Sequence, residues 1–293
     1  MGPLLILICT LIWGTAFLAQ KSGAEHFGPL SLTCLRNLLA TAFLATAIAI
    51  HDRFARAPWR MGRSELVGGT LSGLVLFGAM TAQQIGIEST TPGVSAFLTA
   101  NYILFVPVLA WLTGRSKPGR AVIIGVVLAL AGSYLISVRA TDAVFAIGPG
   151  ELWTLLCAVL FAVQIMVVDR FARKVDIVRF SIVQLFAAAL FSAPFILLPS
   201  ELARASWSGF AAGLPALLYI GLLSSGVAYT LQNLGQARTP PALAAIIMSM
   251  ESVFSALFAW LLRDVTMPPR QILGCALVFA AVILAQLPLL RRR

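Results

Sequence analysis

The stretch that decides the fold is Pro241–Leu262, with the sequence PALAAIIMSMESVFSALFAWLL. It is almost wholly apolar and has about the 20 residues that a helix needs to cross the hydrocarbon core of a bilayer. Its only charged side chain, Glu251, lies about ten residues from either end, hence about 15 Å deep at 1.5 Å per residue. An ionisable group near the bilayer centre is costly, so we expect Glu251 to face a cavity or a partner.

A related stretch, Pro92–Thr113, occurs about half a chain earlier. Read at an offset of 149 residues, it aligns Tyr102 with Glu251. The identities at this offset are Pro92 with Pro241, Ala96 with Ala245, Phe105 with Phe254, and Ala110-Trp111-Leu112 with Ala259-Trp260-Leu261. The chain therefore carries two copies of one helix, with a different polar residue at the same depth.

The duplication extends to the rest of the chain. At offset 149, Gln83-x-x-Gly86 recurs as Gln232-x-x-Gly235, and Gly125 recurs as Gly274. At offset 148 the aligned residues are Leu7 with Leu155, Cys9 with Cys157, Trp13 with Phe161, Arg36 with Gln184, and Phe43 with Phe191. We expect two related units, residues 1–138 and 149–293, with a linker at 139–148.

Composition excludes a soluble protein. The 293 residues are 59% apolar and 11% charged, against about 45–50% and about 25% in soluble chains. Membrane lipid must therefore surround most of the chain, as an all-α integral membrane protein, because lipid cannot satisfy exposed backbone groups. The ten candidate spans are 3–20, 29–50, 65–85, 92–113, 119–138, 149–168, 177–198, 208–231, 240–262 and 269–288. Pro107 lies inside the fourth span and is predicted to kink or hinge it.

The net charge of +10 is scattered over short connectors and forms no basic helix face, which argues against nucleic-acid binding. It is better interpreted by the rule that cytoplasmic loops carry excess Lys and Arg. With a cytoplasmic N-terminus, the cytoplasmic side holds fifteen: Arg53, Arg56, Arg60, Arg63, Arg115, Lys117, Arg120, Arg170, Arg173, Lys174, Arg179, Arg238, Arg291, Arg292 and Arg293. The outer side holds five: Lys21, Arg139, Arg204, Arg263 and Arg270.

We therefore expect both termini in the cytoplasm. The start, Met1-Gly2-Pro3, has no basic region and argues against a cleaved signal peptide. Each unit has five spans, an odd number, so the second unit must enter the membrane from the opposite side. Such inverted-topology repeats are typical of secondary transporters, which bind their solute near the midplane where the repeats meet. The pattern predicts a central cavity between the two halves.

The ordered, doubled motifs resemble the drug/metabolite transporter superfamily, specifically its EamA-type ten-helix exporters. The residues that carry the resemblance are Trp13-Gly14, Gly28-Pro29 with Arg36, Pro92 to Pro107-Val-Leu-Ala-Trp111-Leu, and Met250-Glu251-Ser-Val-Phe254 to Trp260-Leu-Leu. The resemblance covers the whole chain. It implies two inverted halves around a central cavity and export of small metabolites across a bacterial inner membrane.

Within that group the chain is similar to the YddG-type amino-acid exporters. It departs from the family pattern in two places. The family often has Glu-Pro in the ninth helix, where this chain has Glu251-Ser252. The acidic residue that often ends the fourth and ninth helices survives only as Asp264, and Gly114-Arg115 stands in the first half.

Two charged residues inside spans have two interpretations each. Glu251 is a candidate for proton coupling or for binding a substrate amine; alternatively, its carboxylate only secures a helix–helix contact. Arg36 lies about seven residues into the second span, on the outer side. It could attract a substrate carboxylate, although reaching the outer interface or pairing with a carbonyl is the more common behaviour of such a side chain.

A set of aromatic and neutral polar side chains recurs at helical spacing in both units. Their use is either to line a cavity for an amphipathic solute or to hydrogen-bond between helices. The candidates for substrate binding are Trp13, Phe17, Met80, Gln83, Gln84, Asn101, Tyr102, Phe161, Gln164, Tyr229 and Glu251; Gln20, Gln232 and Asn233 share these helix faces. An aromatic face can also hold an ammonium group by cation–π attraction.

We therefore expect a secondary exporter of small metabolites, foremost apolar or aromatic amino acids, working by alternating access. Hydrophobic organic cations are the alternative substrates. A membrane enzyme is disfavoured, since the two histidines, His26 and His51, have no carboxylate cluster nearby. Inverted repeats with lone polar residues at mid-depth argue against a structural partner or channel subunit. No metal site or cofactor is expected, and the cysteines Cys9, Cys34, Cys157 and Cys275 suggest packed thiols. Protons are the candidate coupling ion, and one chain with both halves can suffice as a monomer.

Overall fold

The computed structural model describes residues 1–55, 61–114, 117–137, 148–263 and 267–290, with a few side chains within these ranges left out. The linker predicted at 139–148 falls outside the described residues except for its last residue. The same is true of several charged residues used above: Arg56, Arg60, Arg115, Arg139, Asp264, Arg291, Arg292 and Arg293. Every regular element in the described ranges is helical, and ten helices are long and apolar enough to cross a membrane, which confirms the predicted fold class.

The predicted spans agree with the structure to within a few residues. Six of them are single helices: α1 (Gly2–Ala24), α2 (Pro29–Ala55), α3 (Arg63–Ser89), α6 (Arg120–Ser137), α7 (Pro149–Phe171) and α14 (Pro269–Leu290). The seventh span is α8 (Ile177–Ser192) continued by η1 (Ala193–Leu197) and followed by the short α9 (Pro199–Leu202). The eighth is α10 (Trp207–Leu218), the π-helical segment η2 (Tyr219–Val227) and α11 (Ala228–Gln236).

The fourth and ninth spans are each broken at the same place in the repeat. The fourth consists of α4 (Pro92–Thr99) and α5 (Tyr102–Leu112), and the ninth of α12 (Pro241–Met248) and α13 (Met250–Arg263). Each break is a tight turn with i to i+3 hydrogen bonds, for example from Ile103 N to Ala100 O and from Ser252 N to Ser249 O. Pro107 lies inside α5, beyond the break, and the ninth span breaks without a proline. The break is therefore a feature of the repeat.

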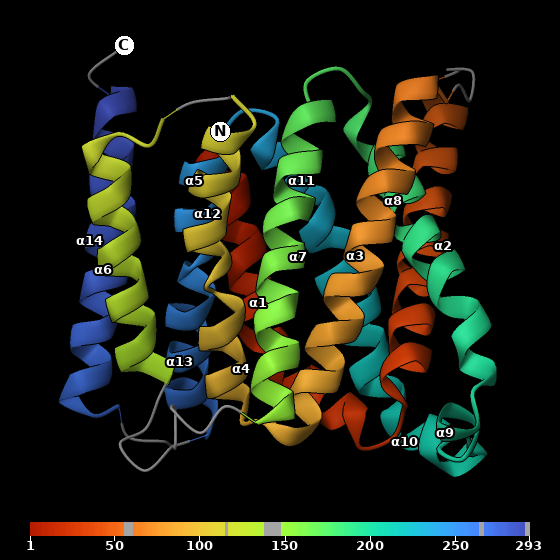
Figure 1. Cartoon of the computed structure of the whole chain (residues 1–293). Helices are drawn as coiled ribbons and strands as arrows, with labels where there is room; N and C mark the ends of the chain where they lie inside the picture. The colour runs from red at the N-terminus through yellow and green to blue at the C-terminus, as the bar shows by residue number, and fades with distance from the viewer. Residues whose placement is uncertain (56–60, 115–116, 138–147, 264–266, 291–293) are drawn as a thin grey trace.

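The helices form one bundle in which the two halves interleave. At one edge α6 packs on α14, and at the other α2 and α3 pack on α8 (Figure 1). The first helix α1 begins on the side where α14 ends, whereas α7 begins on the other side (Figure 1). We call these sides the terminal face and the opposite face. Equivalent helices of the two halves thus run in opposite directions, as inverted repeats require.

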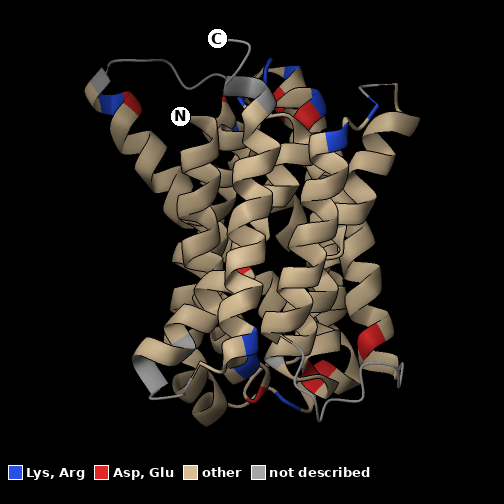
Figure 2. Cartoon of the chain, turned by 90° about the vertical axis from the view of Figure 1, so that its left-hand side faces the viewer, with Lys and Arg blue, Asp and Glu red and all other residues tan. Residues whose placement is uncertain are grey.

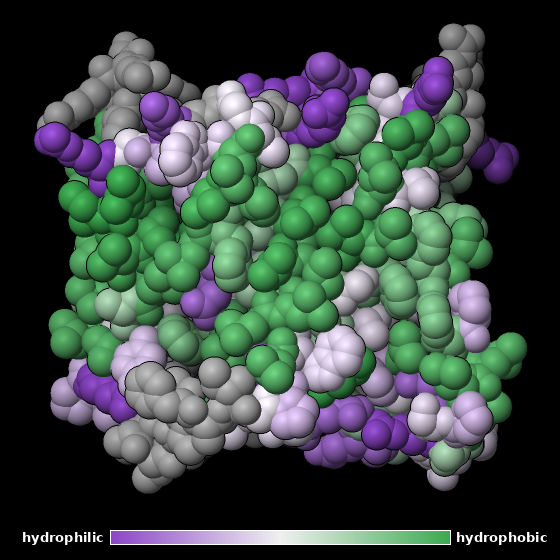
Figure 3. All heavy atoms as spheres, viewed as in Figure 1, coloured by the Kyte–Doolittle hydropathy of each residue, from purple (hydrophilic) through white to green (hydrophobic). Residues whose placement is uncertain are grey.

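The outside of the bundle matches a bilayer. Figure 3 shows a broad apolar band around the middle, with hydrophilic residues above and below it. Most charged residues lie near the two ends of the helices (Figure 2). Large apolar side chains of the spans, such as Ile123, Leu190 and Phe279, are half exposed or more on this surface. In water such a band would be unfavourable, and in lipid it is the expected surface of a multi-pass membrane protein.

Two buried carboxylates related by the repeat tie α2 to the second half at both faces. Glu201 accepts hydrogen bonds from Leu30 N (3.2 Å) and Ser31 N (2.9 Å), and so caps the first turn of α2 at the opposite face. Asp52, its counterpart at offset 149, pairs with Arg179 in the first turn of α8 at the terminal face (2.6 Å). Carboxylate contacts therefore hold α2 at both ends, to α9 at the opposite face and to α8 at the terminal face.

Replacing Glu201 with alanine should destabilise the protein by about 1–3 kcal/mol, because it leaves two partly buried N–H groups of α2 without their carboxylate partner. The matched control is Glu88→Ala. It removes an ion pair with Arg204 that is partly exposed to solvent, and such a pair contributes about 0–1 kcal/mol to stability. Unfolding by SDS titration in mixed micelles measures both. Equal effects of the two substitutions would show that the cap of α2 contributes little.

Candidate functional site: a central cavity between the repeats

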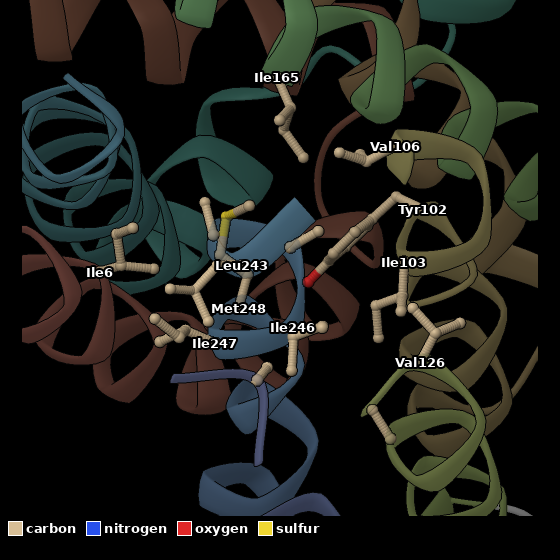
Figure 4. Close-up of a cluster of buried hydrophobic side chains, with 14 of the residues drawn as sticks. Ile6, Tyr102, Ile103, Val106, Val126, Ile165, Leu243, Ile246, Ile247 and Met248 are labelled. Carbon is tan, nitrogen blue, oxygen red and sulfur yellow. The ribbon is translucent and has the colours of Figure 1, made fainter. Parts of the chain in front are cut away.

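The breaks in the fourth and ninth spans bring the two aligned polar residues together. Tyr102 begins α5 and Glu251 lies in the first turn of α13, so both follow directly after a break. The Tyr102 hydroxyl donates a hydrogen bond to Glu251 Oε1 at 3.2 Å. Both side chains are buried, and residues 149 positions apart in the sequence thus meet at mid-depth. In Figure 4 the Tyr102 ring extends from its own helix toward the helix that carries Ile246 and Met248.

These residues stand in the wall of a narrow cavity of about 40 Å³ between the helices, so a solute larger than a few water molecules needs the walls to move apart. Both halves of the chain contribute to it. The lining residues are Trp13, Ala16, Phe17, Gln20, Arg36, Gln83, Thr99, Tyr102, Phe161, Ile165, Ser224, Tyr229, Gln232, Met248 and Glu251. The cavity thus contains a carboxylate, a guanidinium, neutral polar groups and several aromatic rings.

Most of the wall consists of residues that the repeat relates to one another. At offset 149 the pairs are Gln83 with Gln232, Thr99 with Met248, and Tyr102 with Glu251; at offset 148 they are Trp13 with Phe161 and Phe17 with Ile165. Gln20 and Arg36 have counterparts that do not line the cavity. Both lie in the half of their helices nearer the opposite face, so the cavity extends from mid-depth toward that face.

Arg36 is buried in this wall, with 3% of its surface exposed. Its Nε donates to Ser225 Oγ at 2.8 Å and its second guanidinium nitrogen donates to Ser224 Oγ at 3.3 Å. Both serines lie in the π-helical segment η2, a conformation that often occurs at functional sites. The guanidinium is therefore buried away from the interface, and among the described residues it bonds to serine hydroxyls and to no carbonyl, unlike the behaviour that its sequence position favoured.

The two buried ionisable side chains of the cavity, Arg36 and Glu251, have no oppositely charged partner in the part of the chain that the structure describes. Among the described residues, no carboxylate lies within 4.0 Å of Arg36, and no Lys, Arg or His nitrogen lies within that distance of Glu251. Arg36 has two serine hydroxyls and Glu251 has one tyrosine hydroxyl as partners. Charges buried in this way are costly unless something pairs with them. The cavity offers one binding group for an anion and one for a cation.

The rest of the cavity wall is largely aromatic. The Trp13 and Tyr229 rings pack with centroids 4.9 Å apart and planes tilted by 60°. The indole of Trp13 is fixed by a hydrogen bond from Nε1 to Ser224 O at 3.0 Å. Phe17 and Phe161 complete this part of the wall. An apolar side chain can pack against these aromatic rings, and a cation can bind over a ring face.

Seven of the eleven predicted binding residues, together with Arg36, line the cavity. The other four lie in helix contacts instead. Met80 accepts from Asn37 Nδ2, Gln84 donates to Gln20 O, and Asn101 donates to the carbonyls of Phe97 and Leu98. Gln164 accepts from Gln232. The bonds of Met80, Gln84 and Gln164 run between helices, as the interhelical interpretation described, whereas those of Asn101 stay within its own span.

Several lining residues were not among the predicted ones. Thr99 and Met248 are repeat-related and stand one turn before Tyr102 and Glu251, so extending the alignment by one turn could have identified them. Ser224 gave no sequence signal, because a serine in an apolar helix is usually a packing residue. Among the described residues, no group of three or more His, Cys, Asp or Glu side chains is placed to hold a metal ion.

Comparisons with known proteins agree with this architecture. The sequence profile of the EamA-like transporter family matches residues 1–138 and again residues 148–287. An uncharacterized transporter of Archaeoglobus fulgidus is 26% identical over 96% of this chain and 84% of its own length. A probable terminal-alkyne amino-acid exporter of Streptantibioticus cattleyicolor is 26% identical over 98% of this chain and 94% of its own.

A solved crystal structure shares the fold. It superimposes with a TM-score of 0.76 at 22% identity, over 100% of this chain and 99% of the other. At that identity the likeness concerns the fold alone.

Proposed function

This chain belongs to the EamA-like transporter family, and from that premise we propose that it exports amino acids with apolar or aromatic side chains. The protein is a multi-pass membrane transporter. The finer proposal concerns its substrate, its mechanism and its direction. Secondary transport by alternating access is proposed, with the two halves, residues 1–138 and 149–293, rocking about the central cavity.

One observation carries the substrate proposal: the cavity holds a guanidinium and a carboxyl group next to an aromatic wall, and neither has an oppositely charged partner among the described residues. An amino acid is a zwitterion with complementary groups. Its carboxylate would bind Arg36, its ammonium would bind Glu251, and its side chain would lie among Trp13, Phe161 and Tyr229. Charge-assisted hydrogen bonds of this kind are about twice as strong as neutral ones, so both ends contribute to selectivity.

The alternative substrate, a hydrophobic organic cation, fits only part of the site. Glu251 and the aromatic wall would suit an ammonium group, but Arg36 would repel it. The printed name of the Streptantibioticus cattleyicolor relative, a probable exporter of an amino acid, also favours the zwitterion. The relatives with functional names are transporters, which favours transport over a membrane enzyme.

We propose that the terminal face is cytoplasmic in a bacterial inner membrane. Excess Lys and Arg mark the cytoplasmic side, and the described cations divide accordingly. The terminal face holds Arg53, Arg63, Lys117, Arg120, Arg170, Arg173, Lys174, Arg179 and Arg238, and the opposite face holds Lys21, Arg204 and Arg270. The cavity then extends toward the outside, which corresponds to the release side for an exporter.

The proposal is tested by transport in proteoliposomes loaded with single labelled amino acids. Saturable efflux of phenylalanine, leucine or tryptophan is expected, with little movement of aspartate or lysine, whose extra charge has no partner in the cavity. Liposomes that contain the Arg36→Gln, Glu251→Gln double variant serve as the control. Saturable efflux of organic cations without any amino-acid efflux would contradict the substrate class.

A further inference from the structure

A second group of polar side chains is buried between α7, α8 and α11, on the terminal side of the cavity. Its members, here called the amide cluster, are Gln164, Ser181, Gln184, Gln232, Asn233 and Gln236. None is more than 2% exposed, and only Gln232 also lines the cavity. Hydrogen bonds join Gln232 to Gln164 at 3.2 Å, and Asn233 to Ser181 and Gln184 at 2.9 Å each.

The hydrogen bonding of the amide cluster is incomplete. Within the part of the chain that the structure describes, six amide atoms have no partner: the nitrogens of Gln164, Gln184 and Gln236, and the oxygens of Gln232, Asn233 and Gln236. A buried amide without a partner costs free energy, the more so in a low-dielectric interior. Three free donors and three free acceptors in one cluster are suited to a polar guest or to water.

The repeat shows what these residues correspond to in the first half. At offset 148, Gln164 aligns with Ala16 and Gln184 with Arg36; at offset 149, Gln232 aligns with Gln83. Ala16, Arg36 and Gln83 all line the cavity that extends toward the opposite face. Three of the six members of the amide cluster are therefore repeat-related counterparts of the open half of the cavity, whereas Thr33, Gln84 and Ile87, the counterparts of Ser181, Asn233 and Gln236, do not line it.

We propose that the amide cluster is the collapsed terminal-side half of the solute path and binds the polar head of a zwitterionic solute when the halves exchange conformations. The free donors meet the solute carboxylate, and the free acceptors meet its ammonium group. The counterpart of Arg36 here is the neutral Gln184, so this entry site binds through hydrogen bonds without a fixed charge. This inference rests on the proposed function for the nature of the solute.

The test is labelling with a membrane-impermeant maleimide in protein whose native cysteines are replaced. Gln184→Cys is compared with Ser72→Cys. Ser72 is a fully buried residue of α3 whose hydroxyl also lacks a partner, but it lies outside the cluster. Both positions are about 10–13 Å below the terminal face by helix rise. We expect Gln184→Cys to react at least about 10-fold faster than Ser72→Cys from the terminal face, and phenylalanine to slow the reaction.

Equal rates at the two positions, or labelling of Gln184→Cys only from the opposite face, would overturn the inference. Asn233→Cys provides a second position in the cluster if Gln184→Cys fails to fold. The labelling without solute needs no identified substrate. If the cluster is labelled from the terminal face while phenylalanine has no effect and is not transported, the entry path stands and the proposed substrate fails.

Discussion

Replacing Arg36 with glutamine is expected to raise the KM for phenylalanine by about 10- to 100-fold. A hydrogen bond to a charged group contributes about 1.5–3 kcal/mol, and each 1.4 kcal/mol of binding free energy corresponds to a tenfold change in the dissociation constant. Glutamine retains a donor for Ser225 but cannot attract a carboxylate. The measurement is concentration-dependent transport in proteoliposomes, with the thermal stability of the purified variant measured in parallel.

Two variants separate binding from folding at this position. Arg36→Lys keeps the positive charge and is expected to raise the KM for phenylalanine less than Arg36→Gln does. Ser225→Ala removes one of the hydroxyls that hold the guanidinium, and is expected to have a smaller effect on KM than either. If Arg36→Gln lowers the melting temperature but leaves KM unchanged, then Arg36 holds α2 against the segment η2 and does not bind solute.

Replacing Glu251 with glutamine is expected to abolish accumulation driven by a pH gradient. Exchange at saturating solute concentration should continue with a raised KM, because the variant also loses the partner of the solute ammonium group. Glutamine has nearly the same shape and can still accept the hydrogen bond from Tyr102. It cannot bind and release a proton, so it cannot couple a proton gradient to the movement of the halves. The measurement is uptake or efflux of labelled phenylalanine with and without an imposed gradient, compared with exchange at equal pH.

Tyr102→Phe is the matched control, because it removes the partner of Glu251 and leaves the carboxylate in place. It should retain the response to the gradient. A Glu251→Gln protein that still accumulates solute in response to the gradient would exclude Glu251 as the coupling group. A loss of both accumulation and exchange, in folded protein, would assign Glu251 to amine binding alone.

The spans were predictable because twenty-residue apolar runs have few other uses in a protein. The meeting of Tyr102 and Glu251 follows from their alignment at mid-depth, since inverted repeats place equivalent residues near one axis. For the same reason, four of the five repeat-related pairs in the cavity wall contain at least one predicted residue. The sequence repeat is thus informative about the site as well as the fold.

Other features depended on three-dimensional geometry. The break at Ser249 has no proline or glycine to announce it, and the proline at 107 lies beyond the corresponding break. Met80 and Gln84 share helix faces with cavity residues but point into contacts between helices. The rotation of a helix about its axis decides which of its side chains face the cavity. The periodicity of the sequence determines that rotation only to within about one residue. The burial of Arg36 depends on the π-helical segment η2, whose wider turn the sequence did not indicate.

The central claim is that two unpaired opposite charges select a zwitterion. Equilibrium binding of three ligands of similar size tests it most directly: phenylalanine, phenethylamine, which lacks the carboxylate, and 3-phenylpropionate, which lacks the amine. The account predicts that wild-type protein binds phenylalanine at least about tenfold more tightly than either analogue. Binding of phenethylamine as tight as that of phenylalanine would contradict the claim and would make the protein a carrier of organic cations.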